Sequence, residues 1–148
     1  MKEELEQNLY KLAPILYQQH TLNMQQTCMC WGFETPDTWY NLLYKLSEKL
    51  EKLNQELKDK HIEIQAVQVK EKFGSLKFYY DIINNSDNND INITELSKHV
   101  QDLIDEVEKE SWNICCFCGK PATKTTVGWI SRACDKCIKE RGLITKEI

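Results

Sequence analysis

The sequence predicts an α+β fold, in which three helices pack on a β-hairpin and a four-cysteine ribbon follows at the C-terminal end. Apolar residues recur at helical spacing in three segments, and residues 62–82 change to a period of two. The 148 residues are enough for an α+β body, residues 1–112, and a small ribbon, residues 113–148, which we expect to dock on the body. Two C-x2-C pairs, separated by fifteen residues, define the ribbon: Cys115, Cys118, Cys134 and Cys137.

Proline bounds the first two predicted helices. Residues 5–17 place apolar side chains on one helical face, and Pro14 predicts a kink or a division into two short helices. After an irregular stretch, Thr35 is a candidate N-cap and Pro36 suits the first helical position. The second helix is therefore predicted to begin there, to carry one continuous leucine-rich stripe, and to end near Lys60.

A hairpin and a third helix follow. In residues 62–82 the alternation shifts its phase at Val67, which predicts a bulge or a two-sided strand, and Gly74 lies in the turn. A lone hairpin is only marginally stable, so it must pack on the helices. The third helix is predicted over residues 94–112, with Asn92 as its N-cap.

The four cysteines predict a structural zinc site, which makes the C-terminal segment a zinc ribbon with Zn²⁺ as its cofactor. Each C-x2-C turn brings two thiolates to one ion, and the residues between the pairs can fold back to unite them. Four thiolates complete a tetrahedral shell and leave no position for a substrate. Cys116 lies inside the first pair, but only Cys115 gives that pair the spacing of the second. Buried free thiols or disulfides are the alternative interpretation.

Composition favours a cytoplasmic protein without a membrane partner. The net charge is −4, and no apolar run approaches the length that spans a bilayer. The acidic N-terminal residues lack the apolar segment of a signal peptide. Seven cysteines without such a signal indicate a reducing compartment and metal binding rather than a disulfide framework.

Three strings, taken in order, resemble a family of small uncharacterised proteins that occur mostly in bacteriophages and prophages. They are T-C-M-C-W-G-F-E, V-K-E-K-F-G-S-L-K-F-Y-Y and the ribbon pattern C-x2-C-G…G-W…C-x2-C. The resemblance runs over residues 24–138. Where family members often carry C-G-D-G-W, this chain has residues 35–39, T-P-D-T-W, without the cysteine. The resemblance implies no activity; it implies a small accessory protein of a mobile element, acting in a bacterial host cell.

Three charged surfaces are candidate binding sites, with ordinary solvated faces as the alternative in each case. The acidic face of the third helix could imitate a phosphate backbone towards a host protein; it holds Asp102, Asp105, Glu106 and Glu108. The hairpin interleaves aromatic residues with lysines that could bind a partner: Lys70, Lys72 and Lys77. The ribbon, with seven basic and three acidic residues from 115 onward, offers a possible nucleic-acid surface: Lys120, Lys124, Arg132, Lys136, Lys139 and Arg141.

Tryptophans and the first cysteines have structural interpretations. We expect the four tryptophans to pack in the interior, and any that is exposed to anchor a partner: Trp31, Trp39, Trp112 and Trp129. Cys28 and Cys30 could bind a second metal together with His20, but two small buried thiols are the simpler interpretation.

Motifs for catalysis are not apparent in the sequence, which has no phosphate-binding loop and no dinucleotide fingerprint. We therefore expect a zinc-binding protein that is not an enzyme and that binds a host protein or a nucleoprotein complex. Inhibition of bacterial immunity, such as CRISPR, fits this expectation. The alternative function is a zinc-ribbon regulator that binds DNA or RNA, and the third hypothesis is a small enzyme that uses Cys28 and His20.

Overall fold

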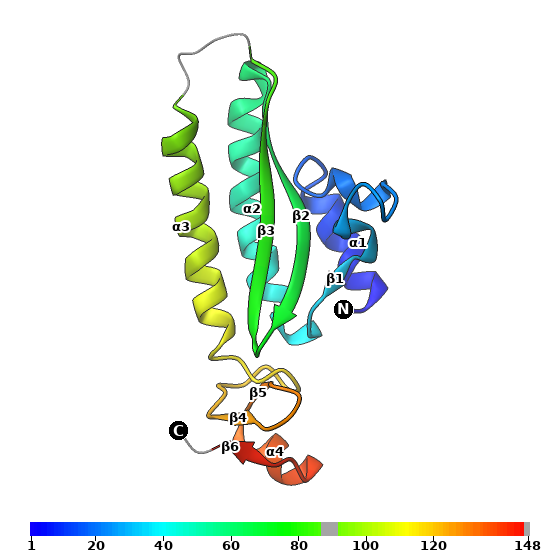
Figure 1. Cartoon of the computed structure of the whole chain (residues 1–148), viewed down its shortest axis with the longest axis vertical. Helices are drawn as coiled ribbons and strands as arrows, with labels where there is room; N and C mark the ends of the chain where they lie inside the picture. Colours follow the sequence, from blue (N-terminus) through cyan, green and yellow to red (C-terminus); the bar gives the residue numbers. More distant parts are fainter. Residues whose placement is uncertain (87–91, 147–148) are drawn as a thin grey trace.

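The computed structural model describes residues 1–86 and 92–146. Its α-helices are α1 (Glu3–Leu12), α2 (Tyr40–Leu57), α3 (Ile93–Ser111) and α4 (Asp135–Arg141). Short 3₁₀ turns are η1 (Gln18–Thr21), η2 (Cys28–Trp31), η3 (Asp37–Trp39) and η4 (Lys58–Lys60). The strands are β1 (Phe33–Glu34), β2 (Ile62–Lys72), β3 (Ser75–Asn84), β4 (Lys124–Thr126), β5 (Arg132–Ala133) and β6 (Thr145–Lys146). In Figure 1 the molecule is elongated, with β2 and β3 running along α2 and α3 and the ribbon at the turn end of the hairpin.

The fold is mixed α and β, as predicted, but the described residues form two three-stranded sheets where the sequence predicted one two-stranded hairpin. Strands β2 and β3 are antiparallel, and β1 adds a parallel strand to β2, with Phe33 opposite Val69. Two residues of strand are too few to give an alternation pattern, so the sequence did not reveal β1. The ribbon adds a second three-stranded sheet, ordered β5-β4-β6, and a fourth helix, so the prediction of three helices on a hairpin was incomplete. The predicted irregularity in β2 is present as a register shift between Ala66 and Gln68.

The two N-terminal helix predictions are confirmed only in part. The predicted interruption at Pro14 is present, since α1 ends at Leu12, because a proline disfavours helical backbone in the residue before it and has no N–H to donate. The next helical segment is the 3₁₀ turn η1, which begins at Gln18, so residues 13–17 do not form a second α-helix. The second α-helix begins at Tyr40 rather than at Thr35, after the 3₁₀ turn η3. Among the described residues the buried Thr35 hydroxyl has no hydrogen-bond partner, so it does not cap a helix. The predicted cap of the third helix is confirmed, since Asn92 Oδ1 accepts a hydrogen bond from Glu95 N at 3.0 Å.

Two polar side chains of α2 satisfy the backbone that neighbouring segments leave unpaired. After α1 ends, Ile15 N and Leu16 N donate to the carboxylate of Glu51 at 3.1 and 3.0 Å. Asn54 bonds both backbone groups of Ile64, accepting from its N–H at 2.7 Å and donating to its carbonyl at 3.0 Å. Glu51 and Asn54 are buried, so these bonds meet the requirement that interior polar groups find partners.

Helix α3 covers the free edge of the body sheet. Leu76 N donates to Ser111 Oγ at 2.8 Å, and Phe78 N donates to Glu108 Oε2 at 2.9 Å. Both amides belong to β3, whose other edge pairs with β2. Side chains of α3 therefore occupy edge groups that would otherwise be open to another strand. Beneath them lies a single apolar core shared by the sheet and helices α1, α2 and α3.

The ribbon contacts the body where the hairpin turn meets the end of α3. The Arg132 guanidinium lies 4.4 Å from the centre of the Trp112 ring. A Cβ on Gly74, which has φ +87°, would lie only 3.2 Å from both of these side chains. Glycine at the hairpin turn therefore permits the turn to approach the ribbon closely.

Candidate metal centre

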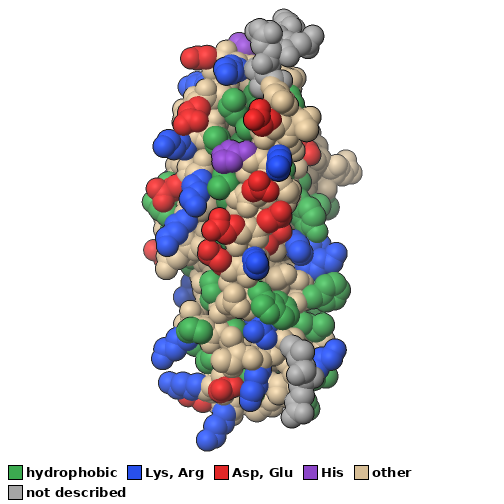
Figure 2. All heavy atoms as spheres, turned by 90° about the vertical axis from the view of Figure 1, so that its left-hand side faces the viewer, with side chains coloured by type: hydrophobic (Ala, Val, Ile, Leu, Met, Phe, Trp, Pro, Cys, Tyr) green, Lys and Arg blue, Asp and Glu red, His purple; other side chains and the backbone are tan. Residues whose placement is uncertain are grey.

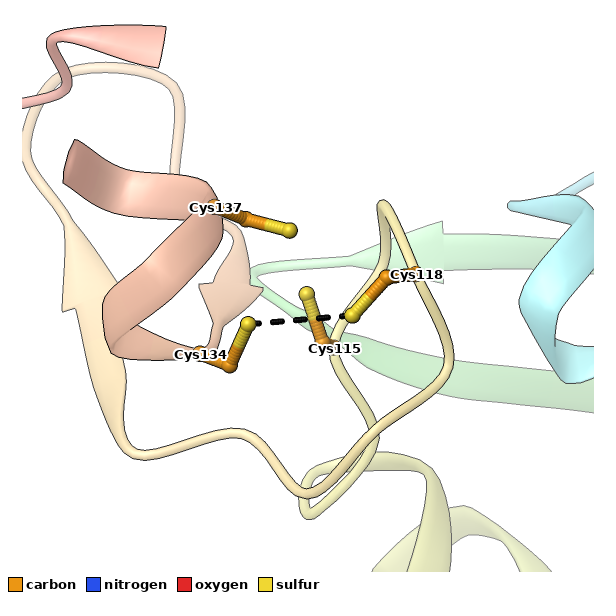
Figure 3. A group of neighbouring side chains, drawn as sticks. All are labelled: Cys115, Cys118, Cys134 and Cys137. Atoms are coloured by element: carbon orange, nitrogen blue, oxygen red, sulfur yellow. Dashed lines mark hydrogen bonds between the residues drawn. The ribbon is translucent and has the colours of Figure 1, made fainter. Parts of the chain in front are cut away.

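The first two cysteines of the cluster lie in a tight turn directly after α3. Cys115 N donates to Lys120 O at 2.7 Å, and Gly119 N donates back to Cys115 O at 2.9 Å. Gly119 has φ +81°, a conformation that glycine adopts without steric cost. This closed turn directs Cys115 and Cys118 to the same side, as Figure 3 shows.

The second pair comes from the first turn of α4. Cys134 is the N-cap residue of this helix, and Cys137 follows one turn later. Residues three apart on a helix lie on the same face, so the C-x2-C spacing brings the two thiols together. Strands β4 and β5 lie between the pairs and return the chain to the first turn, with Lys124 opposite Ala133.

The four thiols that the sequence singled out converge on one point (Figure 3). Their sulfur atoms all lie within 4.8 Å of one another, and Cys118 Sγ is 3.7 Å from Cys134 Sγ. A tetrahedron with metal–sulfur bonds of about 2.3 Å requires sulfur–sulfur distances of about 3.8 Å. All seven cysteines are free thiols, so the disulfide alternative does not describe this structure. The arrangement could hold a metal ion.

Burial and charge in the cluster also fit a cation. Cys115, Cys134 and Cys137 are buried, whereas Cys118 is exposed. Burial raises the pKa of Cys115, but backbone N–H groups of Cys134, Cys118 and Phe117 outweigh it and bring this pKa to about 6. Burial and the neighbouring thiols raise the pKa of Cys137 to about 12. Four thiolates at this separation repel one another, and a bound divalent cation offsets that repulsion.

Cys116 lies outside this cluster, as its spacing predicted. Its half-buried thiol has a pKa raised to about 11, by burial and by the charges of Glu71 and Cys115. Cys28, Cys30 and His20 do not gather either, and because Cys28 is exposed and Cys30 is only partly buried, the interpretation as two buried thiols was wrong. The His20 ring stacks on Tyr10, with 3.9 Å between centroids, and Cys30 Sγ contacts Thr27 O at 3.3 Å. Within residues 1–86 and 92–146, the four ribbon cysteines are the only cluster of at least three Cys, His, Asp or Glu with the spacing of a metal site.

The predicted acidic surface divides into two parts. Asp102, Asp105 and Glu106 are exposed on α3, and Figure 2 shows acidic side chains gathered along this side of the molecule. Glu108 is half-buried and holds Phe78 N, and burial raises the pKa of its carboxyl above the ordinary range. Glu108 therefore has a structural task in addition to any role at the surface.

The predicted basic residues of the ribbon divide in the same way. Arg132 is only 8% exposed, and its guanidinium donates to Trp112 O and Thr125 Oγ1, each at 2.9 Å. Lys124 pairs with Asp135 at 3.3 Å, and Lys136 with Glu140 at 3.9 Å. Arg141 lies over the Phe117 ring at 4.0 Å, while Lys120 and Lys139 are exposed. The structure thus places Arg132 inside the junction between ribbon and body, and the other five on the surface.

Tryptophan packing was predicted correctly for only part of the set. Trp39 is buried and Trp112 is partly buried against Arg132. Trp31 and Trp129 are 62% and 85% exposed, so the prediction that these two are interior residues was wrong. The ribbon packs on the body through the contact of Arg132 with Trp112. Trp129 takes no part in that contact, and its side chain lies in solvent.

A cleft between the hairpin turn and the ribbon was not anticipated. It has a volume of about 270 Å³ and is lined by Glu71, Lys72, Phe73, Gly128, Trp129 and Ile130. The lining comes from two segments, residues 71–73 and 128–130, which are more than fifty positions apart in the chain, so no local pattern could show that they meet. The adjacent Gly128 and Trp129 were the only signal, since glycine before an aromatic residue is typical of an exposed turn.

Comparisons with protein-family models, with curated proteins and with solved structures give no match for this chain. None of the helices in the described ranges is both long and apolar enough to span a bilayer.

Proposed function

We propose that this chain is a zinc-binding protein that acts by binding another macromolecule and not by catalysis. The observation that carries the proposal is the convergence of four cysteine sulfurs within 4.8 Å. Four thiolates form a soft, tetrahedral donor set that suits zinc. When Zn²⁺ is bound by four protein ligands it has no open position for water or substrate, so it serves the fold.

The ion would stabilise a ribbon that has little apolar core of its own. Its buried apolar cluster consists of three of the cysteines and Ala133, with Phe117 and Ile138 packed against them. Such a cluster contributes little hydrophobic stabilisation, and zinc sites of this kind supply folding free energy. The ribbon in turn positions Arg132 and Trp129 at the end of the hairpin.

For the partner, we propose a host protein or nucleoprotein complex, bound as an inhibitor of bacterial immunity would bind it. The exposed carboxylates of Asp102, Asp105 and Glu106 support this proposal, because a row of negative charge on a helix steers towards basic channels built for nucleic acid. The resemblance to phage and prophage proteins gives the same setting, a bacterial cytoplasm.

A zinc-ribbon regulator that binds DNA or RNA is the second candidate. The exposed Lys120, Lys139 and Arg141 favour it, since solvated basic side chains neutralise phosphates. Arg132 does not contribute to that surface, because its guanidinium is used inside the protein.

Affinity capture from a nuclease-treated bacterial lysate, with native mass spectrometry of the captured complex, tests the proposal. A discrete protein partner should survive nuclease treatment with the wild-type chain and be lost when Asp102, Asp105 and Glu106 are each changed to lysine. Changing Glu4, Glu48 and Glu56 to lysine, which are also exposed acids, is the matched control. Partners that disappear with nuclease would favour the regulator, and capture that is equal in both triple variants would count against binding through α3.

A further inference from the structure

Two large aromatic side chains face the cleft between the hairpin turn and the ribbon. Phe73 is 68% exposed and Trp129 is 85% exposed. Rings of this size are usually buried, because burying one removes well over 100 Å² of apolar surface from water. Two exposed rings at one cleft therefore indicate a surface that binds a ligand.

The loop that carries Trp129 has a well-defined backbone. Thr126 Oγ1 donates to Trp129 O at 2.6 Å and accepts from Ser131 N at 2.9 Å. Thr126 N donates to Ser131 O at 3.0 Å, which closes the loop. Gly128, with φ +83°, supplies the left-handed residue that the turn needs. The ring is thus presented on a backbone that is ordered before any ligand arrives, which lowers the entropic cost of binding.

Basic side chains continue from the cleft along the outer face of the hairpin. Lys70 and Lys72 lie two residues apart on β2, and Lys77 on β3 is directly opposite Lys70. Like charges in directly opposite positions destabilise a sheet, so their presence suggests another use. Lys72 Nζ lies 5.9 Å from the Phe73 ring centre, and Lys70 Nζ lies 6.0 Å from that of Tyr79.

Acidic groups lie near part of this row: Glu34 of β1 is opposite Lys70, and Glu108 lies near Lys77. Among the described residues, however, none of the three lysines forms an ion pair. The one carboxylate at the cleft, Glu71, is half-buried and hydrogen-bonded by Ser131. The face therefore combines exposed aromatic rings with lysine ammonium groups that, in the part of the chain that the structure describes, form no ion pair.

This combination fits one class of ligand better than others. Nucleobases stack on aromatic rings, and the phosphates between them attract lysines, so single-stranded DNA or RNA satisfies both features at once. A duplex keeps its bases stacked internally and offers no ring face to Phe73 or Trp129. A protein partner would use the rings, but only a partner with an unusually acidic surface would also match the lysines.

We propose that the hairpin face and the adjoining cleft bind single-stranded nucleic acid, with bases stacked on Trp129 and Phe73 and phosphates held by Lys70, Lys72 and Lys77. The inference goes beyond the function proposed above, because it concerns a surface separate from the acidic face of α3 and needs no host protein. It also differs from binding through the ribbon lysines, which lie outside the set of residues named.

Fluorescence anisotropy with labelled oligothymidylate and oligouridylate of about twelve nucleotides, a length within the usual site sizes, tests the proposal. Full-length, zinc-loaded protein should bind either strand at about 50 mM salt and bind a duplex of the same length more weakly. Trp129→Ala should weaken single-strand binding by at least about fivefold, the loss expected for one stacking ring. Trp31→Ala, which removes another exposed tryptophan outside the cleft, should leave binding unchanged.

Charge variants separate this face from the rest of the surface. Changing Lys70, Lys72 and Lys77 to glutamine should reduce the slope of log affinity against log salt by about 2. The same change at Lys45, Lys49 and Lys52, exposed on α2, should leave the slope unchanged. Equal metal content and circular dichroism show that each variant is folded.

The proposal is overturned if neither strand binds at low salt, if the duplex binds as tightly, or if Trp129→Ala behaves like Trp31→Ala. A protein captured through Trp129 without any single-strand binding would also overturn it and would identify the cleft as a protein interface. Because the test of the proposed function uses α3 variants and a protein partner, either proposal can fail while the other stands.

Discussion

Arg132 and Trp112 join the ribbon to the body through two contacts at once. The guanidinium lies 4.4 Å from the centre of the indole ring, and its Nε donates to the Trp112 carbonyl at 2.9 Å. Trp112 directly follows α3, whereas Arg132 opens β5. One side chain of the ribbon, Arg132, thus donates a hydrogen bond to the backbone carbonyl of Trp112 and packs on its indole ring, just after the longest helix in the described structure ends.

Replacing Arg132 should therefore loosen the ribbon on the body. We expect Arg132→Ala to lower the free energy of unfolding by about 2–3 kcal/mol, because it removes charge-assisted hydrogen bonds and leaves buried acceptors unpaired. Arg132→Lys should restore little of the lost stability, since a lysine ammonium lacks both the several N–H donors in one plane and the flat stacking surface of a guanidinium. Urea denaturation measures the effect. Arg141→Ala, which removes an exposed arginine over Phe117, is the control and should cost less than about 1 kcal/mol. Equal losses in the two alanine variants would contradict the role of burial.

Metal content should depend on four cysteines and not on a fifth. The wild-type chain should purify with a single zinc ion, measured by inductively coupled plasma mass spectrometry, and Cys137→Ser should lose it. Cys116→Ser is the matched control, because this thiol lies next to a ligand in sequence but outside the sulfur cluster, and it should retain the metal. Chelation should unfold the ribbon, because the metal supplies its folding free energy. A folded ribbon without metal, or loss of zinc in Cys116→Ser, would refute the assignment.

Asn54 should be among the most sensitive positions of the body. Asn54→Ala leaves the N–H and the carbonyl of Ile64 without partners in the interior, so we expect a loss of about 2–4 kcal/mol of stability. Asn41→Ala, an exposed asparagine on the same helix, should change stability by less than about 0.5 kcal/mol. Thermal and urea unfolding of the two variants measure the difference, and similar values would show that Ile64 finds other partners.

Glu108 should give the protein a pH-dependent stability. Burial raises the pKa of this carboxyl above its ordinary value of 4.5, so the folded state binds the proton more tightly than the unfolded state. The contribution to stability is then complete below the ordinary pKa and is lost as pH rises through the folded-state value. Relative to Glu108→Gln, the wild type should therefore lose stability as pH increases from about 4.5 towards neutrality. Denaturation of both proteins across this range tests it, and a difference that is constant or grows with pH would be inconsistent with a raised pKa.

Local patterns in the sequence predicted the long elements and the four cysteines that lie close enough together to hold a metal ion. The alternation in β2 and β3, the stripes of α2 and α3, the Asn92 cap and the two C-x2-C pairs are set by residues within a few positions of one another. The same reasoning misplaced the start of α2, because whether Thr35 caps a helix depends on tertiary contacts. The neighbouring Asp37 carboxylate accepts from Lys2 N at 2.8 Å, a contact across 35 positions.

The sequence by itself determined the long α and β segments of the body, the shift in β2 and the four thiols that can share a metal ion, because the spacing of side chains along one helix, strand or turn fixes which of them face the same side. Only the tertiary structure decided that Arg132 is interior, that Glu108 holds β3 and that Trp129 stands in solvent. The burial of a side chain depends on what packs over it, and here the covering groups come from distant parts of the chain. Trp112 is twenty positions from Arg132, and Phe78 is thirty from Glu108. A residue's type gives its chemistry, but the fold decides whether that chemistry is used inside the protein or offered to a partner.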